Sequence, residues 1–252
     1  MGEEDFRALL RDRLGVRLGT VVMVHNSMDL LNLGFGPARA LQLLQEAVGP
    51  QGTLAFPTFP ARSSYEVLKQ GTIFDVRRTP CGSGLLGELA RRQPNARRSL
   101  HPTRSVVALG PLAEALVANH HESPLVCGEG SPFRRIVEMQ GQVIGLGISS
   151  KNLTLVHAVD DHPANPIGLW PYHPSTFLAP CIDETGRRQS VRTYAHNAAR
   201  MAIDIPDFLA QHVDRSIAED FAVGPMHFFR VAAAPLMHRM LELAQRGITI
   251  YS

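Results

Sequence analysis

Cysteine is scarce in this chain, and its spacing excludes several classes of protein. The three cysteines are Cys81, Cys127 and Cys181, and no two of them stand in a C-x-x-C arrangement. An odd number of widely spaced cysteines argues against a disulfide framework and against a structural zinc site. We therefore expect three reduced thiols and no bound metal.

Long apolar runs and positive charge in excess are also missing. No stretch of eighteen apolar residues occurs, and the first residues are acidic and then amphipathic, unlike a secretion signal. Lysine is found only at Lys69 and Lys151, and the formal net charge is +2. These features predict a soluble, cytoplasmic protein that binds neither membranes nor nucleic acid.

The 252 residues, 44% of them hydrophobic, suffice for one domain with a full core, which we assign to residues 1–252. Continuous apolar runs at 19–25, 53–59, 105–109 and 143–148 are typical of strands buried on both faces. Helical spacing separates them at 3–13, 37–48, 84–92, 111–119 and 132–139. This alternation predicts an α/β fold: a layered, mostly parallel central sheet flanked by helices.

The pattern changes in the C-terminal third of the chain. Residues 175–183 and 188–194 flank a turn at Glu184-Thr-Gly186, which predicts an antiparallel β-hairpin inserted at about 170–196. The remaining residues are expected to return to helices, the last of which presents Leu236, Met240 and Leu243 on one face and ends at Gly247.

One segment combines a histidine and acids in helical spacing. His157 stands between apolar neighbours and is followed by Asp160 at i+3 and by Asp161. A helix places positions i and i+3 on one face, so Asp160 can orient the imidazole as a general base requires. Two alternatives stay open for this segment: a buried structural histidine beside solvent-exposed acids, or metal ligation together with His162.

Other candidate ligand-binding residues lie in loops at strand or helix ends. Small polar residues and glycines in such loops let backbone N–H groups approach a phosphate, and helix N-termini attract anions. Each segment also fits an ordinary loop or helix cap. The candidates are Asn26, Ser27, Gly34 and Gly36 after the first strand, Arg98, Ser99, His101 and Ser105 before the third, and Ser131 before Pro132.

Taken in order, these motifs resemble the aminoglycoside 3-N-acetyltransferase family. The resemblance rests on the Val-His-Asn-Ser turn at 24–27, Gly52-Thr53-Leu54 leading into Phe56-Pro57-Thr58, and Arg98-Ser-Leu-His-Pro102 with Ser105. The set also contains Thr79-Pro80 with Gly84, Ala108-Leu-Gly110-Pro, Gly130-Ser-Pro132 and Thr154-Leu-Val-His157. Each motif is common alone, whereas the ordered set covers most of the chain.

The resemblance implies an enzyme that moves an acetyl group from acetyl-CoA to a primary amine by direct transfer, with His157 as general base. It also implies that Asn26, Ser27, Gly34, Gly36, Arg98, Ser99, His101, Ser105 and Ser131 hold the donor. The family usually has glutamate where this chain has Asp160, so either the helix geometry compensates or Asp161 shares the task.

The acceptor amine is left open by the sequence. Residues 163–175 carry Trp170 and Tyr172 but no dense acidic cluster, and the calculated pI of 8.6 does not favour a polycationic substrate. An aminoglycoside and another amine of specialised metabolism both remain candidates, and a homodimer is compatible with the sequence. Alternative functions are a hydrolytic or acyl-transfer enzyme with Cys127 as nucleophile, a metal-dependent hydrolase, and a non-catalytic ligand-binding homologue.

Overall fold

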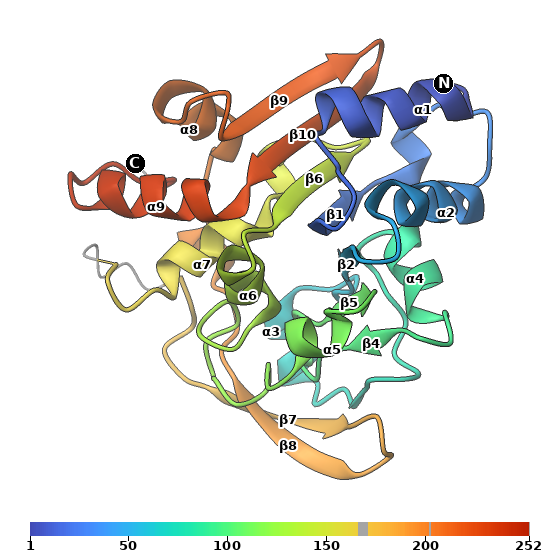
Figure 1. Cartoon of the computed structure of the whole chain (residues 1–252). Helices are drawn as coiled ribbons and strands as arrows, with labels where there is room; N and C mark the ends of the chain where they lie inside the picture. The colour runs from blue at the N-terminus through green and yellow to red at the C-terminus, as the bar shows by residue number, and fades with distance from the viewer. Residues whose placement is uncertain (166–170, 202, 252) are drawn as a thin grey trace.

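The central sheet is built from strands that lie far apart in the sequence (Figure 1). The computed structural model describes residues 1–165, 171–201 and 203–251. The strands are β1 (Val21–Asn26), β2 (Thr53–Pro57), β4 (Arg97–Arg98), β5 (Val106–Leu109), β6 (Gln142–Leu146), β9 (Ala218–Val223) and β10 (Met226–Ala232). Their spatial order is β4-β5-β2-β1-β6-β10-β9.

Parallel pairing is concentrated at the centre of this sheet. β1 pairs in parallel with β2 on one side and with β6 on the other, whereas β5, β4, β10 and β9 join as antiparallel strands. All six residues of β1 are buried, as expected of a strand covered on both faces. The layered α/β prediction is confirmed. The parallel part is the core formed by β2, β1 and β6, and the four flanking strands make the sheet mixed because they join antiparallel.

Helices cover both faces of the sheet (Figure 1). One face packs against α1 (Glu3–Ala8) with a π-helical turn at Leu9–Arg13, α2 (Pro37–Val48) and α4 (Leu85–Arg91). The other face packs against α5 (Ala113–Val117), α6 (Pro132–Glu138), α7 (His157–Asp160), α8 (Ile205–His212) and α9 (Ala233–Ala244). Short 3₁₀ turns occur at Met28–Leu30, Ser150–Asn152, Thr154–Val156 and Ala198–Arg200.

The predicted hairpin forms part of a second, smaller sheet. β7 (Phe177–Ile182) and β8 (Arg188–Thr193) pair antiparallel, which confirms the hairpin, and β3 (Phe74–Asp75) adds to β7 in parallel. A separate apolar cluster that includes Phe74, Cys181 and Val191 lies beneath this sheet, next to α3 (Ser64–Lys69). Figure 1 shows the hairpin projecting from the lower end of the molecule.

One expectation for the C-terminal part is wrong. Residues 218–232 form β9 and β10, not a helix, and the two strands turn at Gly224, whose φ is +57°. β10 hydrogen-bonds to the free edge of β6 and buries Phe228 and Phe229. The tertiary pairing with β6 therefore decides the conformation of this segment. The final helix, α9, is confirmed.

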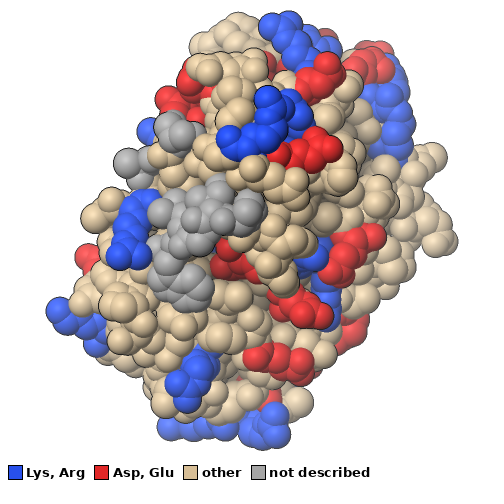
Figure 2. Space-filling model, turned by 90° about the vertical axis from the view of Figure 1, so that its left-hand side faces the viewer, with Lys and Arg blue, Asp and Glu red and all other residues tan. Residues whose placement is uncertain are grey.

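Charges of both signs are interspersed on the face that carries α8 and α9. Figure 2 shows basic and acidic side chains alternating there, without a continuous patch of one sign among the atoms it colours. Among the described residues, no helix has both the length and the apolar character that a membrane span needs.

Candidate active site

A histidine and a carboxylate face each other on the single turn of α7. The 3₁₀ turn Thr154–Val156 leads into this helix, and His157 Nδ1 lies 2.9 Å from Asp160 Oδ2. An ionised carboxylate only accepts hydrogen bonds, so Nδ1 carries the proton and donates it. The lone pair is then on Nε2, the nitrogen that a general base uses.

His157 lines a cavity of about 440 Å³ at the carboxyl end of β1. His25, Asn26 and Ser27 form one wall, and Lys151, Asn152 and Thr154 contribute to another; Pro57, Phe59, Ser83, Ile148, Leu153, Ile203 and Ile205 complete the lining. The chain places β2 on one side of β1 and later β6 on the other, so the strand order reverses at β1. The carboxyl ends of parallel strands at such a topological switch point are where α/β proteins bind ligands. The structure thus brings Asn26, Ser27 and His157 together.

The cavity is polar but not acidic. Lys151 is the one charged side chain among the described residues that line it, and no Asp or Glu is included. His25 also belongs to this wall, and burial lowers its pKa to about 4, which keeps its imidazole neutral near neutral pH. His25 was not among the predicted site residues, although its place at the end of a buried strand could have indicated it.

Asp160, and not Asp161, is the acid that contacts His157. Asp161 Oδ2 instead accepts hydrogen bonds from the Cys127 backbone N–H at 2.8 Å and from the Tyr172 hydroxyl at 2.7 Å. Burial raises the pKa of Asp161 to about 7. The helix geometry therefore accommodates the shorter carboxylate at position 160, and the neighbouring acid has a separate set of partners.

Gly34 and Gly36 lie beside the N-terminus of α2, outside the described lining of the cavity. The Gly34 N–H donates to the Met1 carbonyl at 2.9 Å, and Gly36 is the N-cap of α2. Ser131 is likewise an N-cap, and its hydroxyl accepts from the Arg134 N–H at 3.2 Å. These three residues have local structural tasks, and their role in holding the donor stays a prediction.

Arg98 is buried and surrounded by protein oxygens. Its guanidinium donates to the Thr58 and Ser105 hydroxyls at 3.1 and 3.2 Å, and to the carbonyls of Thr58, Val76 and Thr79. Burial lowers its pKa to about 10, so the group stays charged near neutral pH. This arginine links strand ends to the loop at 76–79.

Ser99, His101 and Ser105 share that buried environment. Ser99 Oγ accepts from the Val106 N–H and contacts His120, and Ser105 Oγ donates to the Thr58 carbonyl. His101 Nδ1 accepts from the Arg104 N–H at 3.0 Å, which leaves Nε2 to donate to Thr193 Oγ1 at 3.2 Å. The segment is bonded to Thr58, which stands between the lining residues Pro57 and Phe59, and none of the predicted residues of the segment is itself among the described lining residues.

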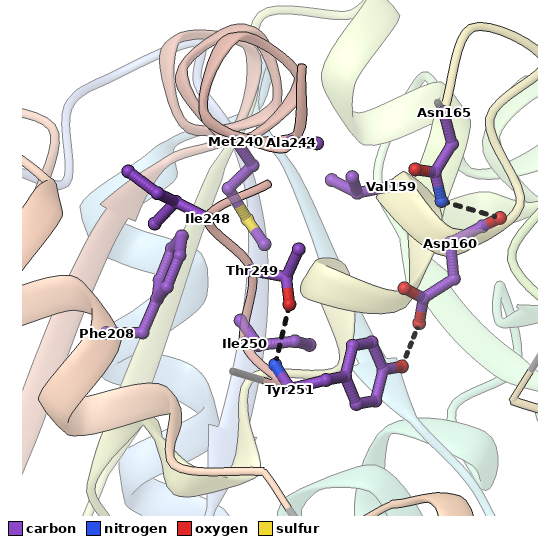
Figure 3. Close-up of a pocket in the computed structure, with 10 residues that line it drawn as sticks. All are labelled: Val159, Asp160, Asn165, Phe208, Met240, Ala244, Ile248, Thr249, Ile250 and Tyr251. Atoms are coloured by element: carbon purple, nitrogen blue, oxygen red, sulfur yellow. Dashed lines mark hydrogen bonds between the residues drawn. The ribbon is translucent and has the colours of Figure 1, made fainter. Parts of the chain in front are cut away.

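Several residues near His157 were missed by the sequence reasoning. The Tyr251 hydroxyl donates to Asp160 Oδ2 at 2.6 Å across 91 residues of sequence (Figure 3). The His196 ring lies 5.2 Å from that of His157, and Arg104 lies 3.3 Å from His196 Nδ1. No local pattern could identify them, because each reaches the site from a distant element. Trp170 lies outside the described residues, and Tyr172 is buried.

Groups of three or more His, Cys, Asp or Glu side chains that could hold a metal ion do not occur within the described part of the chain. The cavity therefore presents an imidazole oriented by a carboxylate, together with amide, hydroxyl and ammonium groups. This fold and site define a class: a layered α/β protein whose oriented histidine can act as a general base at the carboxyl end of parallel strands.

Within that class, the chain belongs to the aminoglycoside 3-N-acetyltransferase family, whose model matches residues 23–244. It is 39% identical over 168 residues to aminoglycoside N(3)-acetyltransferase III of a Salmonella species, a match covering 60% of this chain and 58% of the relative. Aminoglycoside N(3)-acetyltransferase VIII of Streptomyces fradiae is 33% identical over 167 residues, covering 59% and 58%. The match thus spans 58% of the length of these two relatives.

Solved structures share the fold over nearly the whole chain. AAC-VIa bound to sisomicin is 26% identical with a TM-score of 0.78, and the match covers 98% of both chains. The aminoglycoside acetyltransferase AAC(3)-Xa has a TM-score of 0.79 at 24% identity, covering 99% of this chain and 94% of its own. AAC-IIIb in a binary complex with CoASH has a TM-score of 0.78 at 24% identity, covering 100% and 99%.

Proposed function

We propose that this protein is an N-acetyltransferase that moves an acetyl group from acetyl-CoA to a primary amine, with His157 as general base. The observation that carries the proposal is the 2.9 Å contact between His157 Nδ1 and Asp160 Oδ2, because the His157 imidazole also lines the cavity. Family membership over residues 23–244 supports the reaction class.

The chemistry follows from the tautomer of His157. The amine nitrogen attacks the thioester carbonyl, and His157 Nε2 accepts the proton that the amine loses as the C–N bond forms. The C–S bond then breaks, and the imidazolium returns its proton to the departing thiolate. Asp160 stabilises the transient imidazolium and holds the ring in place, as a carboxylate does for a histidine base. No acyl-enzyme is formed.

The donor is proposed to lie along the carboxyl end of β1. Asn26 and Ser27 offer an amide and a hydroxyl to the pantetheine arm, and Lys151 offers a cation to a phosphate. The relative AAC-IIIb has been solved with CoASH, which supports a CoA site in this fold. Seven other predicted donor residues lie outside the described lining, and we propose that they act only by supporting the fold of the surrounding loops and strand ends; they are Gly34, Gly36, Arg98, Ser99, His101, Ser105 and Ser131.

The acceptor is proposed to be an amine of an aminoglycoside or a related metabolite. Sisomicin is a suitable first compound, because the relative AAC-VIa binds it. The described lining carries Lys151 and no carboxylate, so a tight site for a polycation would require acids from elsewhere in the chain. A panel of mono- and polycationic amines therefore tests the charge of the preferred acceptor.

The reaction is tested by release of free thiol from acetyl-CoA in the presence of the amine panel. We expect His157→Ala to lower kcat by roughly 10²- to 10⁴-fold while the fold is retained, because general-base catalysis contributes on this order. Asp160→Asn should lose less, with the acid limb of the rate profile displaced to lower pH because the carboxylate no longer stabilises the imidazolium. His238→Ala is the control, since that side chain is 79% exposed on α9.

The same assay separates the alternative functions. Full activity in His157→Ala would refute the base assignment, and no thiol release with any amine would favour a non-catalytic ligand-binding protein. Cys127 is buried, and its pKa is raised well above the ordinary value by burial and by Asp161, so it does not supply a thiolate nucleophile. We therefore expect Cys127→Ser to retain turnover. Metal analysis of the purified protein tests the metal-dependent hydrolase.

A further inference from the structure

The segment after α9 folds back onto α7, the helical turn that carries His157 and Asp160. Gly247 takes a φ of +74°, and the Ile248 N–H returns to the Leu243 carbonyl at 3.0 Å, which closes the end of the helix. The chain then runs past Phe208 and Met240 toward Asp160 (Figure 3). Ile250 is 4% exposed and fixes the segment in the main core.

Tyr251 ends this path at the carboxylate of Asp160. Its hydroxyl donates to Asp160 Oδ2 at 2.6 Å, and the same oxygen accepts from His157 Nδ1 at 2.9 Å. The Tyr251 N–H is held in turn by Thr249 Oγ1 at 3.0 Å. One carboxylate oxygen thus joins the phenol of the C-terminal segment to the imidazole of α7.

The phenol remains a donor throughout the working range of the site. Burial and the neighbouring charge of Asp160 raise the pKa of Tyr251 above its ordinary value. Val159, Met240, Ile248 and Ile250 line the small pocket around this contact, and their apolar surfaces reduce competition from water (Figure 3).

We propose that Tyr251 is a positioning residue for the His157/Asp160 pair, which fixes the carboxylate and moderates the basicity of the imidazole. The proposal rests on the proposed function, because basicity matters only if His157 removes a proton. Tyr251 itself touches neither the amine nor the thioester; it acts through Asp160.

The direction of its effect can be worked out from the hydrogen bond. A donor on Asp160 withdraws charge from the oxygen that stabilises the imidazolium, so its loss raises the proton affinity of the pair. In Tyr251→Phe we expect the pKa of His157 to rise by about half a unit to one unit. The acid limb of kcat/KM should move to higher pH by the same amount.

Turnover is expected to change as well. On the plateau above the acid limb, kcat of Tyr251→Phe should fall roughly 3- to 10-fold because the pair is less well oriented. KM for acetyl-CoA should stay within about twofold of the wild-type value, since Tyr251 is not among the described residues that line the donor cavity.

Other titratable and charged groups surround the His157/Asp160 pair, and they are the same in the wild type, in Tyr251→Phe and in Ile250→Val. Asp161 belongs to the same turn, and the remaining groups come from the elements packed against it. They are Cys127, Tyr172, His196 and Arg104. Because none of them is altered, the difference between the two titrations reports the phenol hydroxyl.

The test is an NMR titration of the His157 imidazole in the intact protein, with Ile250→Val as the matched control. Ile250→Val loosens the same segment but leaves the phenol, so it should leave the pKa of His157 unchanged. The proposal would be overturned if the pKa of His157 in Tyr251→Phe equalled the wild-type value or lay below it. Equal losses of kcat in both variants without a shifted pKa would also overturn it, by showing that the segment only packs.

The titration needs no substrate, which separates this proposal from the proposed function. If Tyr251→Phe raises the pKa of His157 while His157→Ala keeps full turnover, the contact is real and the base assignment fails. If His157→Ala is inactive and Tyr251→Phe titrates like the wild type, the function stands and the positioning role falls.

Discussion

Two adjacent acids, Asp160 and Asp161, have separate sets of hydrogen-bond partners at one helical turn. Asp160 accepts from His157 and Tyr251, whereas Asp161 accepts from the Cys127 N–H and the Tyr172 hydroxyl. Successive residues on a helix point about 100° apart, so neighbours in sequence can serve unrelated sites. The Asp160 carboxylate holds the His157 imidazole, and the Asp161 carboxylate links the Cys127 backbone to Tyr172.

Asp161 makes the stability of the protein depend on pH. Its pKa is about 7 in the folded protein against an ordinary value of 3.8, so the folded state binds more protons than the unfolded state between these values. Its contribution to stability is present at low pH and is lost as the pH rises toward 7. Between pH 5 and pH 8 the wild type should therefore lose roughly 1 to 3 kcal/mol of unfolding free energy relative to Asp161→Asn.

Urea unfolding of both proteins at pH 5 and pH 8 checks this expectation. Asp183→Asn serves as the control, because the Thr185 hydroxyl and other local donors hold the pKa of Asp183 at about 2, outside the interval. A constant difference between the wild type and Asp161→Asn at the two pH values would show that the Asp161 carboxyl is already ionised at pH 5.

At the scale of elements, Arg98 fastens strand β4 to its surroundings. Its side chain reaches the end of β2 at Thr58 and the carbonyls at 76 and 79, next to β3, and its guanidinium carbon lies 4.8 Å from the Phe74 ring centroid. The preceding residue, Arg97, is exposed and pairs with Glu114 at 2.9 Å. Substitution of Arg98 should therefore lower the free energy of unfolding more than substitution of Arg97.

We expect Arg98→Lys to lower the unfolding free energy by about 2 to 3 kcal/mol, since lysine cannot reproduce a planar set of donors and leaves buried oxygens unpaired. KM for acetyl-CoA should change by less than about twofold, because Arg98 is not among the described lining residues. The matched variant Arg97→Lys should lie within about 0.5 kcal/mol of the wild type. A stable Arg98→Lys protein with a tenfold higher KM would instead place the guanidinium at the donor.

Elements with strong local boundaries could be predicted from the sequence to the residue. Helix α2 begins at Pro37 and ends before Gly49, where the structure has it, because proline and glycine act through their own backbone. Strands β9 and β10 could not be predicted, since their pairing depends on the edge of β6, about 80 residues away. The boundaries of α2 follow from its own residues, whereas the conformation of β9 and β10 follows from pairing with a distant strand.

The site divides in the same way. The His157/Asp160 contact was predictable because helical spacing alone brings positions i and i+3 together. Tyr251 was not predictable, because no periodicity relates residues 91 positions apart. The sequence also could not show that Arg98 points into protein oxygens, since burial is a property of the packed molecule.

At the scale of the whole molecule, one row of residues crosses the sheet behind the cavity. His25 of β1 is in register with Gly145 of β6, which is in register with Phe229 of β10. A side chain at position 145 would meet the Phe229 ring at 2.1 Å, so glycine is required for the ring to lie over β6. The Phe229 ring lies 6.0 Å from that of His25, which lines the cavity.

This row joins the parallel centre of the sheet to its antiparallel flank, so a substitution in it should disturb the packing of both parts. We expect Gly145→Ala to lower the unfolding free energy by roughly 2 to 3 kcal/mol, because the fully buried Phe229 ring must shift to make room. Gly34→Ala, where the nearest atom to an added Cβ is 3.7 Å away, should change stability by less than about 0.5 kcal/mol.

A second substitution tests whether the Phe229 ring is the cause of that loss. Phe229→Leu alone should cost about 1 to 2 kcal/mol by leaving a void, but it also vacates the space that the alanine methyl needs. The double variant should therefore be more stable than the sum of the single losses by about 1 to 2 kcal/mol, as measured by urea unfolding of the four proteins. Strict additivity would mean that the methyl group is accommodated by the backbone of β6. In that event the displacement would pass to His25 through the strand register, and KM for acetyl-CoA would rise in Gly145→Ala whether or not Phe229 is present.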